Sequence, residues 1–213
     1  MIFCFFTATE QRLYSIYTTM KEIIFATHND HKLKEISALF GDEIQLTGLS
    51  TLNFHDEIPE DFETLEENAL QKARHIFDRF KKPCFADDTG LEIFALNGRP
   101  GVYSARYGGM QRNSASNIKK VLHEMEGKTD RDARFRTVIA YLDMNGRKIF
   151  EGIIKGKIIT STRGKSGFGY DPIFIPDGYN ITFAEMPLTE KNKISHRALA
   201  FNQLKLYLAS IHT

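Results

Sequence analysis

The sequence lacks the features that mark several large classes of protein. It has two cysteines, Cys4 and Cys84, and no C-x-x-C motif, so neither a disulfide framework nor a cysteine-based zinc site is supported. This usage suits a reducing compartment, and we expect a cytoplasmic protein. No apolar run approaches the ~20 residues that a membrane-spanning helix needs. The formal net charge is only +1, without the basic excess of general nucleic-acid binders. We therefore expect neither a membrane nor a stable nucleic-acid partner.

The N-terminal segment also lacks a full export signal. Its apolar stretch, Ile2 to Phe6, is short and is soon followed by Glu10 and Arg12. A signal peptide has a basic start and a longer apolar region. We interpret Met1–Thr19 as an extension outside the fold, with a weak export signal as the alternative. We expect residues 20–213 to form a single domain, because no repeat, low-complexity tract or linker divides them.

What is present is an alternation of strand and helix patterns. Hydrophobic periodicity predicts strands at 22–27, 44–49, 84–86, 134–144 and 148–159, and helices at 33–40, 65–80, 114–125 and 195–210. Residues 91–96 fit either a further strand or a turn, and 97–109 should form an ordered loop. The pair Asn145-Gly146 is a strong hairpin signal. Early strand–helix alternation followed by a hairpin predicts an α/β fold on a mixed sheet, with a cleft between two lobes.

The segment after the first expected strand combines groups that suit phosphate. Thr27, Asn29, Lys32 and Glu35 are spaced Thr-x-Asn-x-x-Lys-x-x-Glu where a helix begins. Free N–H groups and a partial positive charge at a helix start bind phosphate, and Lys32 adds a full charge. The alternative is a simple helix cap beside a solvated lysine.

The clearest expected helix, at 65–80, begins with residues that we expect to have different roles. Thr64 followed by Glu67 fits a capping box, in which side chains satisfy free backbone N–H groups. Asn68 and Lys72 are four residues apart and share one face at the edge of the apolar stripe. Lys72 is therefore placed to face inward and bind an anion. Glu60, in the acidic stretch before the helix, is either a metal ligand or solvated.

Asp87 and Asp88 follow the expected strand at 84–86 directly. Adjacent carboxylates are unfavourable unless a cation or hydrogen-bond donors neutralise them. Mg²⁺ prefers carboxylates together with phosphate oxygens. A carboxylate at this place can also accept the proton of an attacking water. The alternative is an Asp-rich turn over residues 87–90.

Two apparent ligand motifs fail for physical reasons. Gly164-Lys165-Ser166 lacks the glycine that a P-loop needs five residues earlier, where Ile159 stands, and Pro172 prevents a following helix. His28 and His31 form His-x-x-His without a third nearby ligand, so solvated loop histidines are favoured over a metal site.

Two further segments suit the recognition of a flat ligand. The Gly-rich stretch at 164–171 predicts a wall where Phe168 or Tyr170 stacks on a base, although an ordinary loop is the alternative. Ser195 should cap the last helix and place His196 and Arg197 in its first turn, where donors can converge on a ligand. Lys191, just before it, supplies another cation, and a solvated basic cap is the alternative reading.

Short motifs carry a family likeness along the chain. They are Ala-Thr-x-Asn-x-x-Lys (26–32), Glu-Asn-Ala-x-x-Lys-Ala (67–73), Ala-Asp-Asp-Thr-Gly-Leu-Glu (86–92), Gly-x-Pro-Gly-Val-Tyr-Ser-Ala-Arg-Tyr (98–107), Gly-Phe-Gly-Tyr-Asp-Pro-Ile-Phe (167–174), Ala-Glu-Met (184–186) and Ser-His-Arg (195–197). In this order, they resemble the house-cleaning inosine/xanthosine triphosphate pyrophosphatases of the Ham1 type, over essentially all of 20–213. Two features depart from the family: His31 stands where many relatives carry glycine, and Met1–Thr19 has no counterpart.

The resemblance implies both an architecture and an activity. The architecture is an elongated mixed β-sheet with flanking helices and two lobes around a central cleft, usually in a homodimer. The activity is Mg²⁺-dependent hydrolysis of dITP, ITP and XTP to the monophosphate and pyrophosphate, which keeps deaminated purines out of DNA and RNA. A 6-oxo group distinguishes these bases from adenine, and donors facing it would reject the adenine amino group.

The resemblance also implies roles for individual residues. Asp88 would be the general base for a water attacking the α-phosphorus, and Glu60 and Asp88 would hold Mg²⁺. The implied substrate-binding residues are Thr27, His28, Asn29, Asp30, His31, Lys32, Lys72 and Thr89 on the phosphate side, Phe168, Gly169, Tyr170 and Asp171 around base and sugar, and Lys191, His196 and Arg197 towards the 6-oxo group.

Two other classes of function stay open from the sequence. One is a related hydrolase of modified pyrimidine triphosphates, which base selectivity would distinguish. The other is a non-catalytic nucleotide- or RNA-binding module. Adjacent Asp87 and Asp88 in a phosphate site argue against that module, because without Mg²⁺ they would repel phosphate.

Overall fold

The computed structural model describes residues 21–29, 32–33, 36–37, 40 and 44–211. The expected extension at 1–19 and the predicted binding residues Asp30 and His31 lie outside this described part. So does part of the helix predicted at 33–40, although the described positions there are helical.

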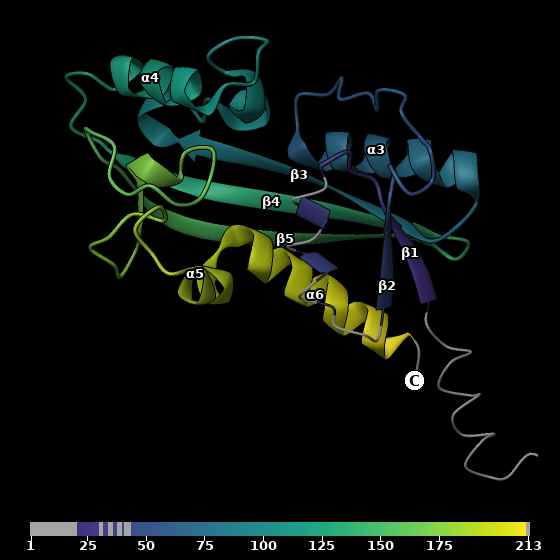
Figure 1. Ribbon diagram of the computed structural model, residues 1–213. Helices are drawn as coiled ribbons and strands as arrows, with labels where there is room; N and C mark the ends of the chain where they lie inside the picture. Colours follow the sequence, from purple (N-terminus) through teal and green to yellow (C-terminus); the bar gives the residue numbers. More distant parts are fainter. Residues whose placement is uncertain (1–20, 30–31, 34–35, 38–39, 41–43, 212–213) are drawn as a thin grey trace, which may run out of the picture.

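A six-stranded mixed sheet forms the frame of the described chain, in the order β2-β1-β3-β4-β5-β6 (Figure 1). Its strands are β1 (Lys21–Phe25), β2 (Ile44–Gly48), β3 (Cys84–Ile93), β4 (Asp132–Asp143), β5 (Gly146–Ile158) and β6 (Phe174–Pro176). β1 runs parallel to β2 and β3, whereas the pairs from β3 to β6 are antiparallel. β3, β4 and β5 are long and connect the two ends of the molecule, so the expected elongated mixed sheet is confirmed.

Helices cover both faces of the sheet. α3 (Leu65–Phe80) lies on one face and α6 (His196–Ser210) on the other (Figure 1). α4 (Ser114–Glu124) and α5 (Leu188–Ile194) lie at the end of the long strands away from the β4–β5 hairpin (Figure 1). The 3-10 helices are η2 (Phe94–Leu96), η3 (Gly101–Arg106) and η4 (Asp171–Ile173). Within the described ranges, every helix is too short or too polar to cross a membrane.

α3 forms where local sequence signals agree. The Thr64 hydroxyl accepts the Glu67 N–H, which confirms the predicted cap at Thr64. The Glu67 carboxylate accepts the Thr64 hydroxyl in place of the Thr64 N–H, so the predicted capping box is only half formed. Its apolar stripe buries Ala69, Ala73 and Ile76 against β3 and β4. Lys81 ends the helix in a left-handed conformation.

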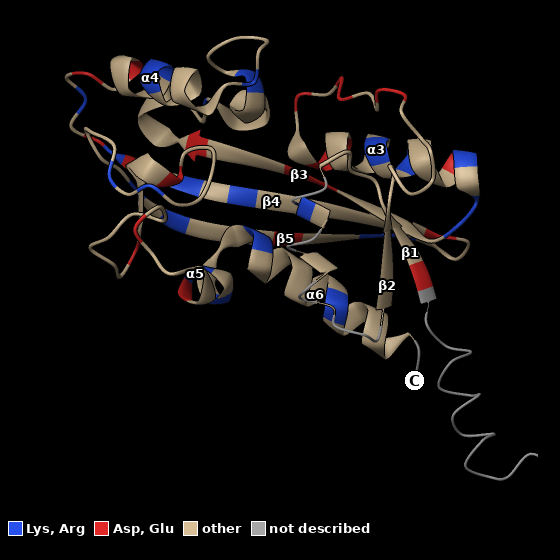
Figure 2. Ribbon diagram, viewed as in Figure 1, with Lys and Arg blue, Asp and Glu red and all other residues tan. Residues whose placement is uncertain are grey.

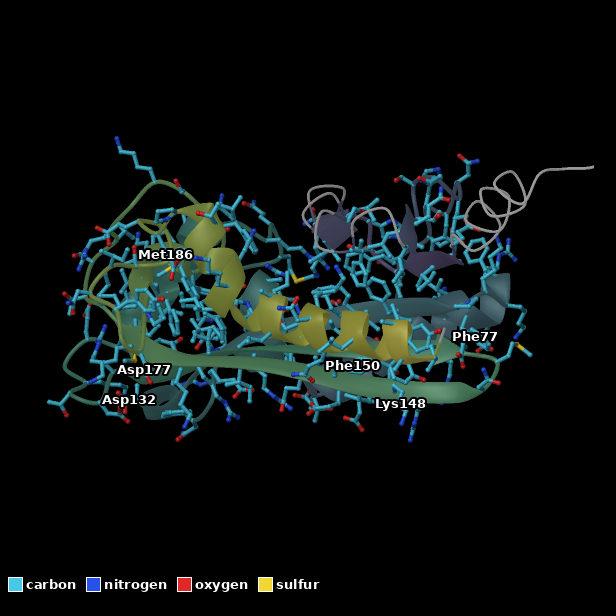
Figure 3. All side chains as sticks on the ribbon, turned by 90° about the horizontal axis from the view of Figure 1, so that it is seen from below. Phe77, Asp132, Lys148, Phe150, Asp177 and Met186 are labelled. Atoms are coloured by element: carbon cyan, nitrogen blue, oxygen red, sulfur yellow. The ribbon has the colours of Figure 1, made fainter. Side chains whose placement is uncertain are left out.

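α6 covers the face of the sheet opposite to α3. Phe201 packs edge-on against Phe25 and Phe85, at ring-centroid distances of 5.9 and 5.7 Å. At the hairpin end of β5, Phe150 and Lys148 lie beside α6 (Figure 3), and both contact Tyr207. The predicted inward positions of this helix are all buried: Ala198, Phe201, Leu204 and Leu208.

A separate apolar core fills the other lobe. Leu91 of β3 and Phe135 of β4 pack there with Ile118 and Val121 of α4 and with Phe174 of β6. The long strands therefore carry one core under α3 and another under α6 at one end, and a third core at the other end. The sheet continues between them, which leaves a cleft between two lobes, as expected from the family likeness.

Three local predictions need correction. The strand predicted at 84–86 continues as β3 to Ile93, so Asp87 and Asp88 lie within a strand and not at its end or in a turn. Their backbones can stay in the ladder because lysines neutralise both carboxylates, as described below. The loop predicted at 97–109 contains η3, and the sequence analysis missed both β6 and α5.

Gly152 of β5 sets how closely α6 approaches the sheet. A Cβ atom at this position would meet the backbone oxygen of His196 and lie 2.6 Å from the Ala200 nitrogen. We expect Gly152→Ala to destabilise the protein by about 1–3 kcal/mol through overpacking, and to raise KM because the start of α6 must shift. Urea unfolding and steady-state kinetics test this. Lys155→Ala, at an exposed position of the same strand, is the control and should change neither.

Candidate active site

A cavity of about 660 Å³ lies in the cleft between the lobes, a size that suits a nucleotide. Several elements contribute to its wall: the segment after β1, the loop before α3, the middle of β3, η3, the start of α4, the Gly-rich loop and the start of α6. The lining residues are Asn29, Lys32, Glu60, Lys72, Asp87, Asp88, Thr89, Gly90, Leu91, Val102, Ser104, Ala105, Arg112, Ser114, Asn117, Phe135, Phe168, Gly169, Tyr170, Asp171, His196 and Arg197.

The turn after β1 places a lysine against β3. The Thr27 hydroxyl accepts the Asn29 N–H, and the Asn29 side chain accepts the Lys32 N–H at 3.0 Å. Lys32 Nζ then lies 2.5 Å from Asp87 Oδ1. The reading of Asn29 as a cap is therefore confirmed, whereas that of Lys32 as a solvated lysine is wrong.

Lys72 of α3 holds two carboxylates. Its Nζ donates to Glu60 Oε1 at 2.5 Å and to Asp88 Oδ1 at 3.4 Å. Glu60 belongs to the acidic loop before α3, which is drawn red in Figure 2. The Lys72 side chain is only 9% exposed, which confirms that it faces inward. Burial favours the neutral amine, but the carboxylates of Asp88 and Glu60 outweigh it and raise the pKa of Lys72.

The adjacent aspartates of β3 have opposite environments. Burial acts to raise the pKa of Asp87, but the charges of Lys32, Arg197 and Lys72 outweigh it and lower that pKa. For Asp88, burial prevails with help from its acidic neighbours, and its pKa is raised despite Lys72. A pair of carboxyl groups with pKa values driven apart is typical of a division between structural and catalytic roles. Asp87 is thus a fixed anion, and Asp88 is the group able to accept a proton.

The site can be tested for its fit to a divalent cation. Within the described ranges, no group of three or more His, Cys, Asp and Glu side chains forms a ready-made metal site. Glu60 and Asp88, however, both face Lys72 from the cleft wall. Mg²⁺ is commonly bound by one or two carboxylates together with substrate phosphates, and this pair provides such a set. The residues present therefore fit a magnesium ion that is shared with a polyphosphate.

The other end of the cleft is lined by aromatic side chains and the Gly-rich loop. Gly167 (φ 78°) and Gly169 (φ 60°) adopt left-handed conformations, and a side chain at Gly167 would meet the Asp171 carboxylate. Asp171 Oδ2 accepts the Phe168 N–H at 2.9 Å and binds Lys191 Nζ at 2.6 Å in a buried ion pair. Phe168 lines the cleft and remains 55% exposed, with Lys191 Nζ 5.0 Å from the centre of its ring.

The start of α6 adds polar groups to the same end. Ser195 caps the helix through the Ala198 N–H, as predicted. His196 stacks on Phe135 at 4.7 Å, and its Nδ1 is buried without a hydrogen-bond partner among the described residues. Burial, with the nearby cations, lowers the pKa of His196 well below its ordinary value, so the ring is neutral at pH 7. The Arg197 guanidinium lies 4.9 Å from the centre of the Phe168 ring.

Comparison with known proteins identifies the family of this fold. A model described as the Ham1 family matches residues 23–207. The chain belongs to the Ham1 family.

Relatives and solved structures of this Ham1-family chain agree with the fold. The dITP/XTP pyrophosphatase of Christiangramia forsetii is 48% identical over 88% of this chain and 99% of its own. That of Porphyromonas gingivalis is 48% identical over 89% of this chain and 98% of its own. The Staphylococcus aureus Ham1 protein superposes with a TM-score of 0.84 at 38% identity, covering 89% of this chain and 99% of its own. A HAM1 protein from Coxiella burnetii superposes with a TM-score of 0.84 at 42% identity, covering 90% of this chain and 100% of its own.

Most residues predicted for the site of this Ham1-family chain do meet in the cleft. Those that line it are Asn29, Lys32, Glu60, Lys72, Asp88, Thr89, Phe168, Gly169, Tyr170, Asp171, His196 and Arg197. Three of the predicted residues that the structure describes do not line it. Thr27 and Lys191 act behind the wall through Asn29 and Asp171, and His28 is exposed with its Nε2 3.0 Å from the Asp56 carbonyl oxygen.

The sequence analysis missed the wall formed by η3 and α4. Asn117 is buried. Its side-chain oxygen accepts the Gly108 N–H, and its side-chain NH₂ group donates to the carbonyl oxygens of Ser104 and Ala105. The Tyr170 hydroxyl donates to the Ser104 carbonyl at 2.8 Å, which ties this wall to the Gly-rich loop. These contacts join distant segments, so single-sequence patterns carry no signal for them.

Proposed function

We propose that this chain hydrolyses non-standard purine nucleoside triphosphates, dITP, ITP and XTP, to the monophosphate and pyrophosphate. Its Ham1-family relatives from Christiangramia forsetii and Porphyromonas gingivalis carry the name dITP/XTP pyrophosphatase. The observation that carries the proposal is Asp88, a partly buried carboxyl group of raised pKa that faces the cleft beside Lys72 and Glu60. Removal of these triphosphates would keep deaminated purines out of DNA and RNA.

The chain's own residues account for the chemical step. Asp88 accepts a proton from the water that attacks the α-phosphorus, and its raised pKa brings it closer to the operating pH, as a general base requires. The new P–O bond forms as the bond to the bridging oxygen breaks, and pyrophosphate departs with the bonding electrons. Lys32 and Lys72, whose side chains are mostly buried, stabilise the charge on the phosphates. Magnesium, when bound to Glu60 and Asp88, supplies further neutralisation of the triphosphate.

The aromatic end of the cleft accounts for selection against adenine. Phe168 offers a ring face for stacking, and the neutral His196 can donate from Nδ1 in one tautomer to a 6-oxo group. Arg197 and Lys191 provide positive charge at the same end. An adenine amino group would leave these donors unpaired in a buried site, which disfavours ATP strongly.

Three further features are part of this proposal. The enzyme uses Mg²⁺, because the carboxylates of Glu60 and Asp88 can bind this ion together with substrate phosphates. It works as a homodimer, as the family likeness implies, and in the cytoplasm, which its cysteine usage suits. Its partner in binding is a free nucleotide rather than a nucleic acid, consistent with a net charge of only +1.

The decisive experiment measures pyrophosphate release from dITP, XTP, dGTP, ATP and dUTP, each with and without Mg²⁺. We expect Mg²⁺-dependent release from dITP and XTP, with dGTP and ATP turned over far more slowly. Faster hydrolysis of dUTP or ATP would contradict the assigned base pocket while leaving the chemistry intact. Binding of dITP without release of pyrophosphate from any substrate would indicate a non-catalytic nucleotide-binding module instead.

A further inference from the structure

Arg112 has an unusual backbone for an arginine. It lies between η3 and α4, immediately before the N-cap residue Asn113, with φ 51°. The other described non-glycine residues in the left-handed region have ordinary reasons to be there. Asn53 and Asn97 belong to a tolerant residue type, and Lys81 ends α3. No such reason applies to Arg112, and strained backbone of this kind concentrates at functional sites.

The Arg112 side chain lines the cleft beside the acidic loop. Burial acts to raise the pKa of Glu60, and the positive charges of Lys72, Arg112 and Arg106 hold it below its ordinary value. Arg106 Nη1 lies 3.8 Å from Glu60 Oε2. Arg112 thus faces the part of the cleft where Glu60 and Lys72 meet, and not the aromatic end.

The cleft's lysines already have carboxylate partners. Lys32 is bound to Asp87 and Lys72 to both Glu60 and Asp88. The Arg112 guanidinium, in contrast, makes no hydrogen bond and no ion pair within 4 Å with any described residue. A polyphosphate brings several negative charges into this space, and an unengaged guanidinium can bind its oxygens with two parallel hydrogen bonds.

We propose that Arg112 binds the polyphosphate chain of the substrate from the side of η3 and α4, and holds the pyrophosphate product until it leaves. This inference rests on the proposed function for its natural ligand. The left-handed backbone at Arg112 keeps the guanidinium over the cleft, and no other lining residue from η3 or α4 carries a positive charge.

The test compares Arg112→Gln, Arg112→Lys and a control, Arg147→Gln, in the full-length protein. Arg147 is exposed in the β4–β5 hairpin and does not line the cleft. Calorimetry with inorganic tripolyphosphate and Mg²⁺ measures binding without turnover of a nucleotide. Inhibition of dITP hydrolysis by pyrophosphate measures the product complex, and the ratio of kcat/KM for dITP and dGTP measures base selection.

We expect Arg112→Gln to weaken tripolyphosphate binding and pyrophosphate inhibition about 10-fold to 100-fold, the range of a lost charge-assisted contact. Arg112→Lys should fall between, because it keeps the charge without the planar fork. Arg147→Gln should match the wild type, and base selection should change in none of the variants. Equal tripolyphosphate affinity in Arg112→Gln and Arg147→Gln would overturn the inference. A wild type that binds tripolyphosphate through Arg112 without hydrolysing dITP would support it while the proposed function failed.

Discussion

Asp88→Asn is expected to lower kcat for dITP by about 10²-fold to 10⁴-fold, the usual contribution of a general base. The amide keeps the shape of the side chain but cannot accept the proton of the attacking water. The variant should nevertheless fold as stably as the wild type or more so. Burial raises the pKa of Asp88, so its ionised form is disfavoured in the folded protein, and that penalty is present at every pH above the raised pKa. A neutral amide removes it.

Steady-state kinetics tests the predicted loss of turnover. Thermal unfolding, measured in EDTA and without substrate, tests the predicted stability. A lower melting temperature would show that the ion pair with Lys72 at 3.4 Å outweighs the burial of Asp88. An enzyme with near-normal turnover would sink the assignment of the base. Loss of activity together with retained stability is the pattern expected where function is maintained at the expense of stability.

The sequence predicted best what local signals specify. The Thr64 cap and the apolar stripe of α3 are contained within 17 consecutive residues, 64–80, and the predicted bounds of the helix are those observed. Asn145-Gly146 likewise brings β4 and β5 together in the expected hairpin. In both cases the residues that determine the structure are neighbours in the chain, so their pattern is visible without the fold.

The errors arise where distant residues change what a segment can do. Asp87-Asp88-Thr89-Gly90 has the composition of a turn, and local propensity favours one. Lys32 and Lys72 come from other elements and neutralise the carboxylates, so this segment stays paired with β4. The same reasoning applies to the wall of η3 and α4, which Asn117 holds through contacts with residues 104–108. Only the folded chain brings these partners together.

Asp87→Asn should destabilise the protein by about 3 kcal/mol, the lower end of the cost of breaking a buried ion pair. The Asp87 side chain is 2% exposed, and its carboxylate lies 2.5 Å from Lys32 Nζ. The variant leaves a mostly buried ammonium without its counter-charge, although the amide oxygen can still accept a hydrogen bond. One position along β3, Asp88→Asn should have no such effect, so each variant is the isosteric control for the other. Equal urea midpoints for the two in EDTA would contradict the assigned division of roles.

Two further measurements identify the ion pair as the cause. Lys32→Met removes the ammonium, so the double variant Lys32→Met/Asp87→Asn should be more stable than the sum of the single changes predicts, by about 0.5–3 kcal/mol. The effect should also depend on pH. Because Lys32, Arg197 and Lys72 lower the pKa of Asp87 against the effect of burial, its stabilisation is complete above the unfolded value near ~4 and is lost as the pH falls through the folded value. The stability gap between the wild type and Asp87→Asn should therefore narrow in acid. Burial lowers the pKa of Lys32 although the Asp87 charge opposes it, so the variant's Lys32 loses its proton at a lower pH and the gap should also narrow on the alkaline side. A gap that stayed the same from acid to alkaline pH would contradict the ion pair as the cause.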